Sequence, residues 1–339
     1  MKAIVRFDRL IGAAAAGAIA VSLAGCGGGG SGNTPPPAAS AAVTYSASAA
    51  VGELVDYTID TTKMTYSYTI TESQYGLMGA TGSGTLALNS DGTYALSGIP
   101  GAKVAVLPNG LLLAAIHATF NGTARTVPVI GIHSPVTTLA AAAGNYNFVQ
   151  RSCLSGVCAS AYGTFKLNGD GTWNSCAGGD VGSATPTCSF QASGTSNSLG
   201  NGKWQVMQGG VNIGTVLAFT SAGQNVMVMD LKDTTNGFGV GILVGSSEQP
   251  VSSTQTDGTW VSLGTDGNVS EFTTSGTTMN FMMGGMMGSA TGMMAMNSPW
   301  TGFVTPSVSG VTGGEALMAG SGVYVYENSG YAQIGMKIH

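Results

Sequence analysis

The sequence predicts an all-β protein of antiparallel β-barrel or β-sandwich modules, and three observations lead to this prediction. Helical periodicity is nearly absent, and short runs of alternating apolar and polar residues are broken by Gly, Asn-Gly and Asp-Gly. Charged residues make up only 8% of the chain, against roughly a quarter in ordinary globular domains. Similar segments also recur along the chain, which indicates related modules that follow one another.

The first 25 residues have the organisation of a signal peptide. The basic n-region contains Lys2, Arg6 and Arg9. The apolar segment LIGAAAAGAIAVSL (10–23) follows it and is too short to span a membrane as a helix. We therefore expect residues 1–25 to be removed on export.

The apolar segment ends in Leu-Ala-Gly-Cys at residues 23–26, which resembles the lipobox of bacterial lipoproteins. The resemblance implies cleavage before Cys26 and acylation of that cysteine. Two or three acyl chains are enough for stable anchoring. Residues 26–42 would then be a lipidated cysteine and a flexible Gly- and Pro-rich tether. Residue 27 is Gly, not the Asp that retains lipoproteins in the inner membrane, so the outer membrane is the expected destination.

Charge limits the partners that we expect. Removal of the signal peptide takes away three of the 11 basic residues and one of the 16 acidic residues, so the mature chain is more acidic than the net charge of −5 indicates. No basic cluster occurs, which makes nucleic-acid binding an unlikely function class. The expected partners are the membrane, through the N-terminal lipid, and an envelope protein or glycan.

Four cysteines remain in the mature chain: Cys153, Cys158, Cys176 and Cys188. Exported chains fold in an oxidising compartment, so an even number predicts two disulfides. Four cysteines allow three pairings. We favour Cys153–Cys158 with Cys176–Cys188, because each bond then closes its own loop. Four thiolates around zinc are the alternative, which compartment and spacing disfavour.

One repeated segment predicts hairpins. GTLALNSDGTYALSG (84–98) matches GTFKLNGDGTWNSCAGG (163–179), and VSLGTDGNVSEF (261–272) is a weaker third copy. In each copy an alternating run meets Asp-Gly, which tolerates the positive φ of tight hairpin turns. The aspartates Asp91, Asp170 and Asp266 are therefore predicted turn residues. A calcium loop is the alternative, but it needs a later bidentate Glu that is missing here.

Two further repeats set the module boundaries. SPVTTLAAAAGNYNF (134–148) and QPVSSTQTDGTWVSL (249–263) share Pro-Val and a later Gly-X-aromatic that opens a strand. NVMVMDLKDTTNGFGVGILV (225–244) similarly matches GVYVYENSGYAQIGMKI (322–338). We predict three modules, 43–133, 134–249 and 250–339, each with roughly six to eight strands. Fusion of neighbouring modules into one larger barrel or sandwich is the alternative.

No catalytic residues are predicted. The histidines His117, His133 and His339 lie far apart in the chain, and no Gly-X-Ser-X-Gly motif accompanies them. The acidic residues are scattered and single out no pair of carboxylates for glycosidase chemistry. Trp173, Trp204, Trp260 and Trp300 are expected in the core, with a sugar-binding groove as the alternative.

Half of the 16 methionines lie in MNFMMGGMMGSATGMMAM (279–296). They are Met279, Met282, Met283, Met286, Met287, Met293, Met294 and Met296. Thioethers are soft ligands that select Cu(I) or Ag(I), so copper binding is one hypothesis. Because methionine also fills irregular apolar spaces, packing between two strands is the favoured interpretation. A docking surface and an oxidant trap are further alternatives.

These features predict an exported, lipid-anchored β-protein of the cell envelope. Its expected role is non-enzymatic: binding, adhesion or envelope structure, with no required cofactor. The first alternative is a periplasmic Cu(I)- or Ag(I)-binding protein that uses residues 279–296. The second is a secreted hydrolase without a recognisable motif.

Overall fold

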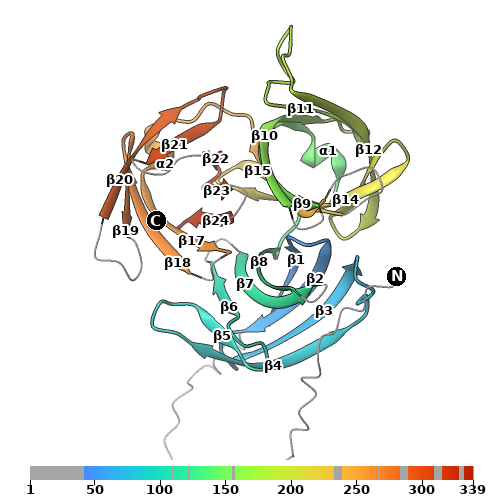
Figure 1. Ribbon diagram of the computed structural model, residues 1–339, viewed down its shortest axis with the longest axis vertical. Coiled ribbons are helices and arrows are strands. Elements are labelled where there is room, and N and C mark those ends of the chain that lie inside the picture. The colour runs from blue at the N-terminus through green and yellow to red at the C-terminus, as the bar shows by residue number, and fades with distance from the viewer. Residues whose placement is uncertain are drawn as a thin grey trace, which may run out of the picture.

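The computed structural model describes residues 42–107, 110–120, 123–154, 157–232, 239–265, 268–282, 289–308, 315–327 and 332–338. These residues form three eight-stranded antiparallel sheets that lie around a common centre (Figure 1). The all-β prediction is confirmed. No helix in the described ranges is long and apolar enough to cross a membrane.

The first barrel is a closed meander in which each strand pairs with the next and β8 pairs with β1. Its strands are β1 (Val43–Ala49), β2 (Glu53–Asp60), β3 (Thr65–Ser73), β4 (Thr81–Leu88), β5 (Tyr94–Leu96), β6 (Lys103–Val106), β7 (Leu111–Phe120) and β8 (Thr123–Ile132). Tyrosines fill much of its interior, with Tyr45, Tyr57 and Tyr66 all buried in one cluster.

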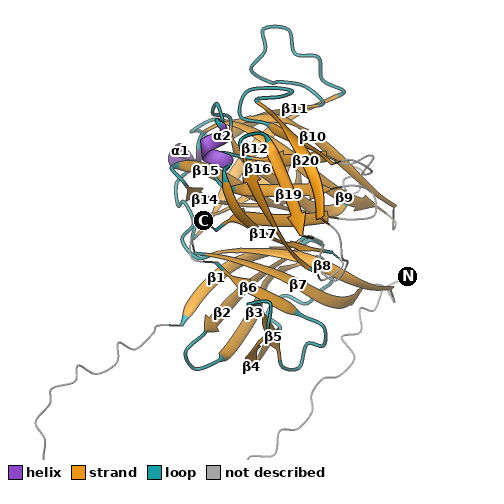
Figure 2. Ribbon diagram, turned by 90° about the vertical axis from the view of Figure 1, so that its left-hand side faces the viewer, coloured by secondary structure: helices purple, strands orange, loops and turns teal. Residues whose placement is uncertain are grey.

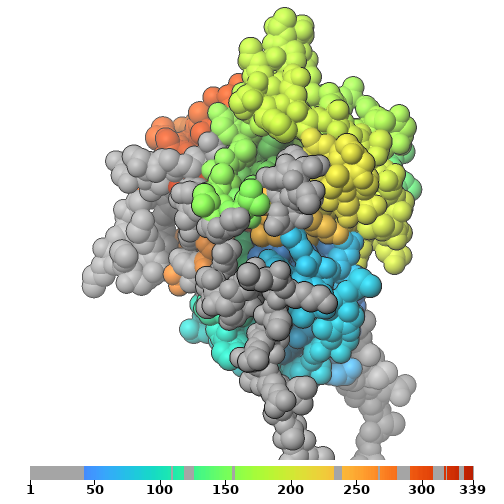
Figure 3. All heavy atoms as spheres, turned by 45° about the vertical axis from the view of Figure 1, so that its right-hand side comes forward, coloured from blue at the N-terminus to red at the C-terminus, as the bar shows by residue number. Residues whose placement is uncertain are grey.

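The second barrel is closed in the same way, by pairing of its last strand with its first. Its strands are β9 (Gly144–Leu154), β10 (Val157–Leu167), β11 (Thr172–Ala177), β12 (Phe190–Gly200), β13 (Lys203–Gln208), β14 (Val211–Ser221), β15 (Gln224–Leu231) and β16 (Val240–Ser247). The loop between β11 and β12 projects from the rest of the molecule (Figures 2 and 3).

The third module repeats the meander as a curved sheet in which β24 pairs with β17. Its strands are β17 (Gly258–Gly264), β18 (Val269–Ser275), β19 (Thr278–Met282), β20 (Ser289–Met296), β21 (Val304–Val308), β22 (Glu315–Met318), β23 (Val323–Glu327) and β24 (Ala332–Lys337). Within the described residues β21 and β22 are its two edges. This sheet is therefore an open counterpart of the two closed barrels.

The Asp-Gly turns form the expected hairpins. The backbone N–H of Asn89 donates to the carbonyl of Thr93 at 2.7 Å. Asp91 Oδ1 accepts from the backbone N–H and the hydroxyl of Thr93, at 3.1 and 2.6 Å. Residues 168–172 repeat all three bonds between β10 and β11. The third copy, at 266–267, lies outside the described residues.

Short helices precede the second and third sheets, α1 (Leu139–Ala142) and α2 (Ser253–Thr256). The Tyr146 hydroxyl donates to the last carbonyl of α1, and Trp260 Nε1 donates to the last carbonyl of α2 at 3.1 Å. Both aromatic side chains belong to the repeated Gly-X-aromatic segment. Burial raises the pKa of Tyr146 to about 12, so its hydroxyl stays protonated and keeps donating.

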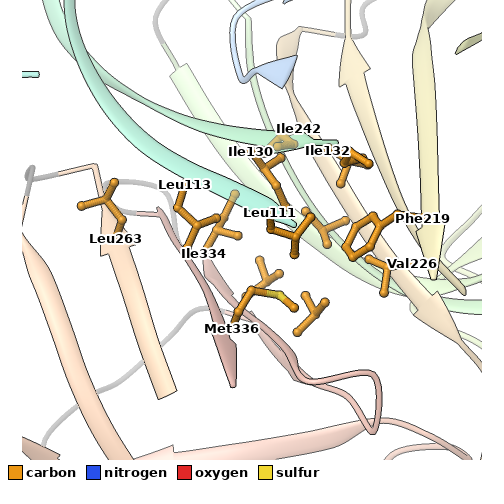
Figure 4. Packing of buried hydrophobic residues seen from close by; sticks show 14 of the residues in the cluster. Leu111, Leu113, Ile130, Ile132, Phe219, Val226, Ile242, Leu263, Ile334 and Met336 are labelled. Atoms are coloured by element: carbon orange, nitrogen blue, oxygen red, sulfur yellow. The ribbon is translucent and has the colours of Figure 1, made fainter. Parts of the chain in front are cut away.

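The three sheets pack on a shared hydrophobic core through strands that are apolar on both faces (Figure 4). On β7, Leu111 and Leu113 point into this core, whereas Leu112 points into the first barrel. The second barrel contributes from β15 and the third sheet from β23 in the same alternating way. Residues i and i+2 of a strand share one face. A strand that is apolar at successive positions therefore packs one face into the shared core and the other face into the interior of its own sheet.

Polar contacts add to the interface between the first two barrels. The Ser48 hydroxyl donates to Asp230 Oδ1 at 3.0 Å, and both residues are buried. Lys203 Nζ lies 3.0 Å from Asp56 Oδ1. These contacts join β1 and β2 to β13 and β15 and help to fix the two barrels relative to each other.

Candidate functional site

The interior of the second barrel contains a cavity of about 310 Å³. That volume is at the lower end of the range typical of small-molecule sites. All eight strands contribute to its wall, and most of the wall is apolar. The lining residues with aromatic or long apolar side chains are Phe148, Phe165, Leu167, Trp173, Phe190, Val206, Ile213, Val216, Met227, Met229, Leu231 and Leu243.

The cavity exists because one side of the barrel carries small inward-facing residues. Strands β10, β11 and β12 place Ala161, Ser175, Ala177, Ala192 and Ser196 on the wall. The first barrel instead places buried tyrosines inside, and the third sheet places tryptophan, phenylalanine and methionine there. An eight-stranded barrel is just wide enough for side chains to fill or to hold one small ligand. The small inward-facing side chains of the second barrel therefore leave a space large enough for one small ligand.

One end of the second barrel is closed by α1, which lies across the opening in Figure 1. Ala142 of α1 is fully buried in the same cluster as Tyr146 and Leu167. The Asp-Gly turn also reaches the helix, because a Cβ atom added at Gly171 would lie 3.1 Å from Leu139 Cδ1. This end is thus packed with side chains.

The opposite end carries both disulfides, Cys153–Cys158 and Cys176–Cys188, which is the pairing favoured by the sequence. The first bond joins the ends of β9 and β10. The second joins β11 to the residues before β12. Phe190 lines the cavity and yet is 52% exposed, so the cavity reaches the surface beside the second disulfide.

Exposed apolar side chains occur toward this end of the barrel. Leu154 and Val157, at the tip of the β9–β10 hairpin, are exposed, as is the lining residue Phe190 at the start of β12. These positions come from one end of the meander, since β9 ends where β10 begins and β11 ends where β12 begins. The exposed ring of Phe190 beside the cavity suits the entry of an apolar molecule.

Two polar atoms in the cavity wall have no hydrogen-bond partner among the described residues. They are the indole donor Trp173 Nε1 and the amide acceptor Gln208 Oε1, and both atoms are buried. Ser175, Ser189 and Gln150 add further uncharged polar groups. None of the residues that line the cavity is charged or titrates near neutral pH, so this wall offers no general acid or base.

Of the four methionines of residues 279–296 whose side chains are described, three belong to one apolar cluster and one lies on the opposite face of its strand. Met279 and Met294 are buried with Trp260 and Phe272 inside the third sheet. Met296 packs against that cluster, and Met293, on the opposite face of β20, is 54% exposed. The filling role is thus observed for the inward-facing ones. Met282 closes β19, its side chain is not described, and Met283, Met286 and Met287 lie outside the described residues. Copper binding stays a prediction.

The two described histidines belong to the first barrel or the residue that follows it, and neither lines the cavity. His117 Nδ1 lies 2.7 Å from the Thr126 hydroxyl, and His133 Nδ1 lies 3.0 Å from the carbonyl oxygen of Thr44. Within the described ranges neither imidazole is hydrogen-bonded to a carboxylate, as a triad requires. His339 and the lipidation residue Cys26 lie outside the described residues. Groups of three or more His, Cys, Asp or Glu side chains suited to a metal are absent from the described part of the chain.

The cavity was not predicted from the sequence, and Trp173 was expected in the core. A usable signal was present, because alternate positions in residues 161–196 carry small residues: Ala161, Ser175, Ala177, Ala192, Gly194 and Ser196. This pattern can be interpreted only when the inward-facing side of each strand is known. A one-residue shift of register would turn the same small side chains to solvent.

No family model matches the chain, and no curated protein matches it. Among solved structures, it is similar to the crystal structure of a point mutant of the vaccine antigen transferrin-binding protein B from Haemophilus parasuis Hp5. The match is 9% identical, covers 84% of this chain and 66% of that chain, and has a TM-score of 0.18. A likeness of this degree gives no basis for assigning a function.

Proposed function

We propose that this protein is a non-enzymatic binding protein of the cell envelope, anchored through Cys26, whose second barrel holds a small apolar molecule. The observation that carries the proposal is the cavity of about 310 Å³ with a mainly apolar wall, which includes the exposed side chain of Phe190. The wall has no titratable side chain, which favours binding over acid–base catalysis. Closure at the α1 end and opening at the disulfide end suit entry from one side.

The binding of N-phenyl-1-naphthylamine tests this proposal. The dye is neutral and apolar, and its fluorescence rises when it leaves water. We expect the full mature chain to bind it at a single site. The variant Ala192→Trp places an indole in the cavity, and we expect its affinity for the dye to fall by about tenfold or more, since a filled cavity leaves no room for the ligand.

The matched control is Ser193→Trp. Ser193 is the next residue of β12 and is exposed on the outer face of the barrel. We expect this variant to bind the dye like the wild type. Circular dichroism and thermal unfolding establish that both variants fold. Absence of dye binding by the wild type, or equal binding by both variants, would overturn the proposal.

A further inference from the structure

The two unpartnered atoms of the cavity wall lie on strands that flank β12. Trp173 of β11 pairs with Gly194 of β12, and Thr195, the next residue, pairs with Met207 of β13. Gln208 directly follows Met207 and lines the cavity. The indole donor and the amide acceptor therefore come from the same level of the wall, one strand on either side of Gly194.

Gly194 makes this arrangement possible. A Cβ atom at Gly194 would lie 2.8 Å from Cζ2 of Trp173, the ring carbon next to the one that carries Nε1. Without a side chain there, the indole lies close against β12, while Trp173 lines the cavity and its Nε1 is buried. By contrast, Trp260 of the third sheet donates to two oxygens, at 3.1 and 3.0 Å. The Trp260 indole that fills the core of the third sheet is thus hydrogen-bonded, whereas Trp173 Nε1 has no hydrogen-bond partner among the described residues.

Buried polar atoms without partners are rare in native proteins, because losing their bonds to water is costly. One unpartnered donor and one unpartnered acceptor in a mainly apolar wall are the pattern by which binding sites fix ligand orientation. A hydroxyl or an amide can satisfy both, since each can accept one hydrogen bond and donate another. A charged ligand would lack a partner, because no lining residue carries a charge.

We propose that the second barrel selects a neutral, mainly apolar ligand whose hydroxyl or amide group accepts a hydrogen bond from Trp173 Nε1 and donates one to Gln208 Oε1. This inference rests on the proposed function and names the ligand class of that site. The apolar body of the ligand would contact Phe165, Met227 and Met229, and its polar group would face β11–β13.

Competition between two matched ligands tests the inference. Naphthalene and 2-naphthol share the same ring system and differ by one hydroxyl. We measure how well each displaces N-phenyl-1-naphthylamine from the full mature chain. Two satisfied buried groups predict that 2-naphthol binds about tenfold tighter than naphthalene. Trp173→Phe and Gln208→Met each remove one partner, so we expect each to cut the ratio of 2-naphthol affinity to naphthalene affinity several-fold.

Trp300→Phe is the matched control. Its Nε1 is also buried without a partner, but Trp300 packs on Tyr162 and Phe303 outside the second barrel. We expect this variant to keep the full preference for 2-naphthol.

The two proposals fail in different ways. If the wild type does not bind the dye, the proposed function is wrong. If the dye and both naphthalenes bind but 2-naphthol has no advantage, or keeps its advantage in both wall variants, the cavity binds ligands and the inferred hydrogen-bonding class is wrong.

Discussion

At the scale of single residues, Asp230 makes the stability of the interface between the first two barrels depend on pH. It follows Met229, which lines the cavity, and therefore points out of the second barrel, toward the first. Burial raises the pKa of Asp230 well above its usual range. The Ser48 hydrogen bond and the positive charge of Lys232 oppose this rise, and nearby Glu53 and Glu72 add to it. Its Oδ2 atom has no partner among the described residues. The neutral carboxyl is thus the form that suits the folded interface.

This shift predicts a pH-dependent gain from Asp230→Asn. Because folding raises the pKa, the stabilising contribution is full below the ordinary carboxyl pKa and is lost as the pH rises through the raised value. Asparagine is neutral throughout, so we expect the variant to unfold at higher urea than the wild type at about pH 8, with a smaller gain at about pH 4.

Asp170 supplies the contrast for that experiment. Hydrogen bonds from the Thr172 side chain and backbone lower its pKa, so its contribution is present above the ordinary carboxyl pKa and is lost as the pH falls. We expect Asp170→Asn to bring no gain at about pH 8. An equal gain from Asp230→Asn at both pH values would contradict the assigned role of Asp230.

At the scale of elements, the second disulfide fixes the rim of the cavity. Cys176 lies between Ser175 and Ala177 of β11, which both line the cavity, and Cys188 lies two residues before Phe190. The bond closes a loop with a sequence separation of 12, against 5 for Cys153–Cys158. The longer loop should therefore contribute more to stability, because closing it removes more disorder from the unfolded chain.

Replacing both members of each pair by serine tests this order. We expect Cys176→Ser with Cys188→Ser to lower the free energy of unfolding by about 3 kcal/mol, and Cys153→Ser with Cys158→Ser to lower it by about 2 kcal/mol. Chemical denaturation under non-reducing conditions gives both values. A larger loss of stability on removal of Cys153–Cys158 would show that packing around the disulfides, and not loop closure, determines their contribution to stability.

Much of the element structure could be predicted from sequence. Asp-Gly turns and the Gly-X-aromatic strand openings depend on local backbone preferences, so residues 89–93 and 168–172 fold as expected. The anchoring of α1 by Tyr146 could not be predicted, because it depends on which side of the strand the ring occupies. The cavity of the second barrel could not be predicted for the same reason. Inward-facing and outward-facing positions of β10–β12 carry similar residues, and only the strand register decides which of them face the interior.

At the scale of the whole molecule, the shared hydrophobic core joins the three modules into one structural unit. Contacts run between β7 and β17, between β8 and β24, and between β9 and both β22 and β23. Three modules were predicted, but their mutual packing was not. Runs such as GLLLAAI and NVMVMDL, apolar at successive positions, were the available signal, since a strand buried on both faces needs a second partner.

Leu113→Ala tests the shared core. Leu113 is 1% exposed and points into the core between the barrels. We expect the substitution to lower the free energy of unfolding by about 2–5 kcal/mol and to leave one cooperative transition. Leu88→Ala, at an exposed leucine of β4, is the control and should change stability by less than about 0.5 kcal/mol. Separate transitions for the barrels in the wild type would argue against a common core.

The ligand cavity of the second barrel is most directly tested by methionine methyl NMR on the full mature chain with 2-naphthol added. Met227 and Met229 line the cavity, whereas Met279 and Met294 are buried inside the third sheet and serve as internal controls. We predict saturable shifts of the Met227 and Met229 methyl signals, with the Met279 and Met294 signals unmoved. Shifts confined to the third sheet, or none at a ligand concentration that saturates dye displacement, would contradict a binding site in the second barrel.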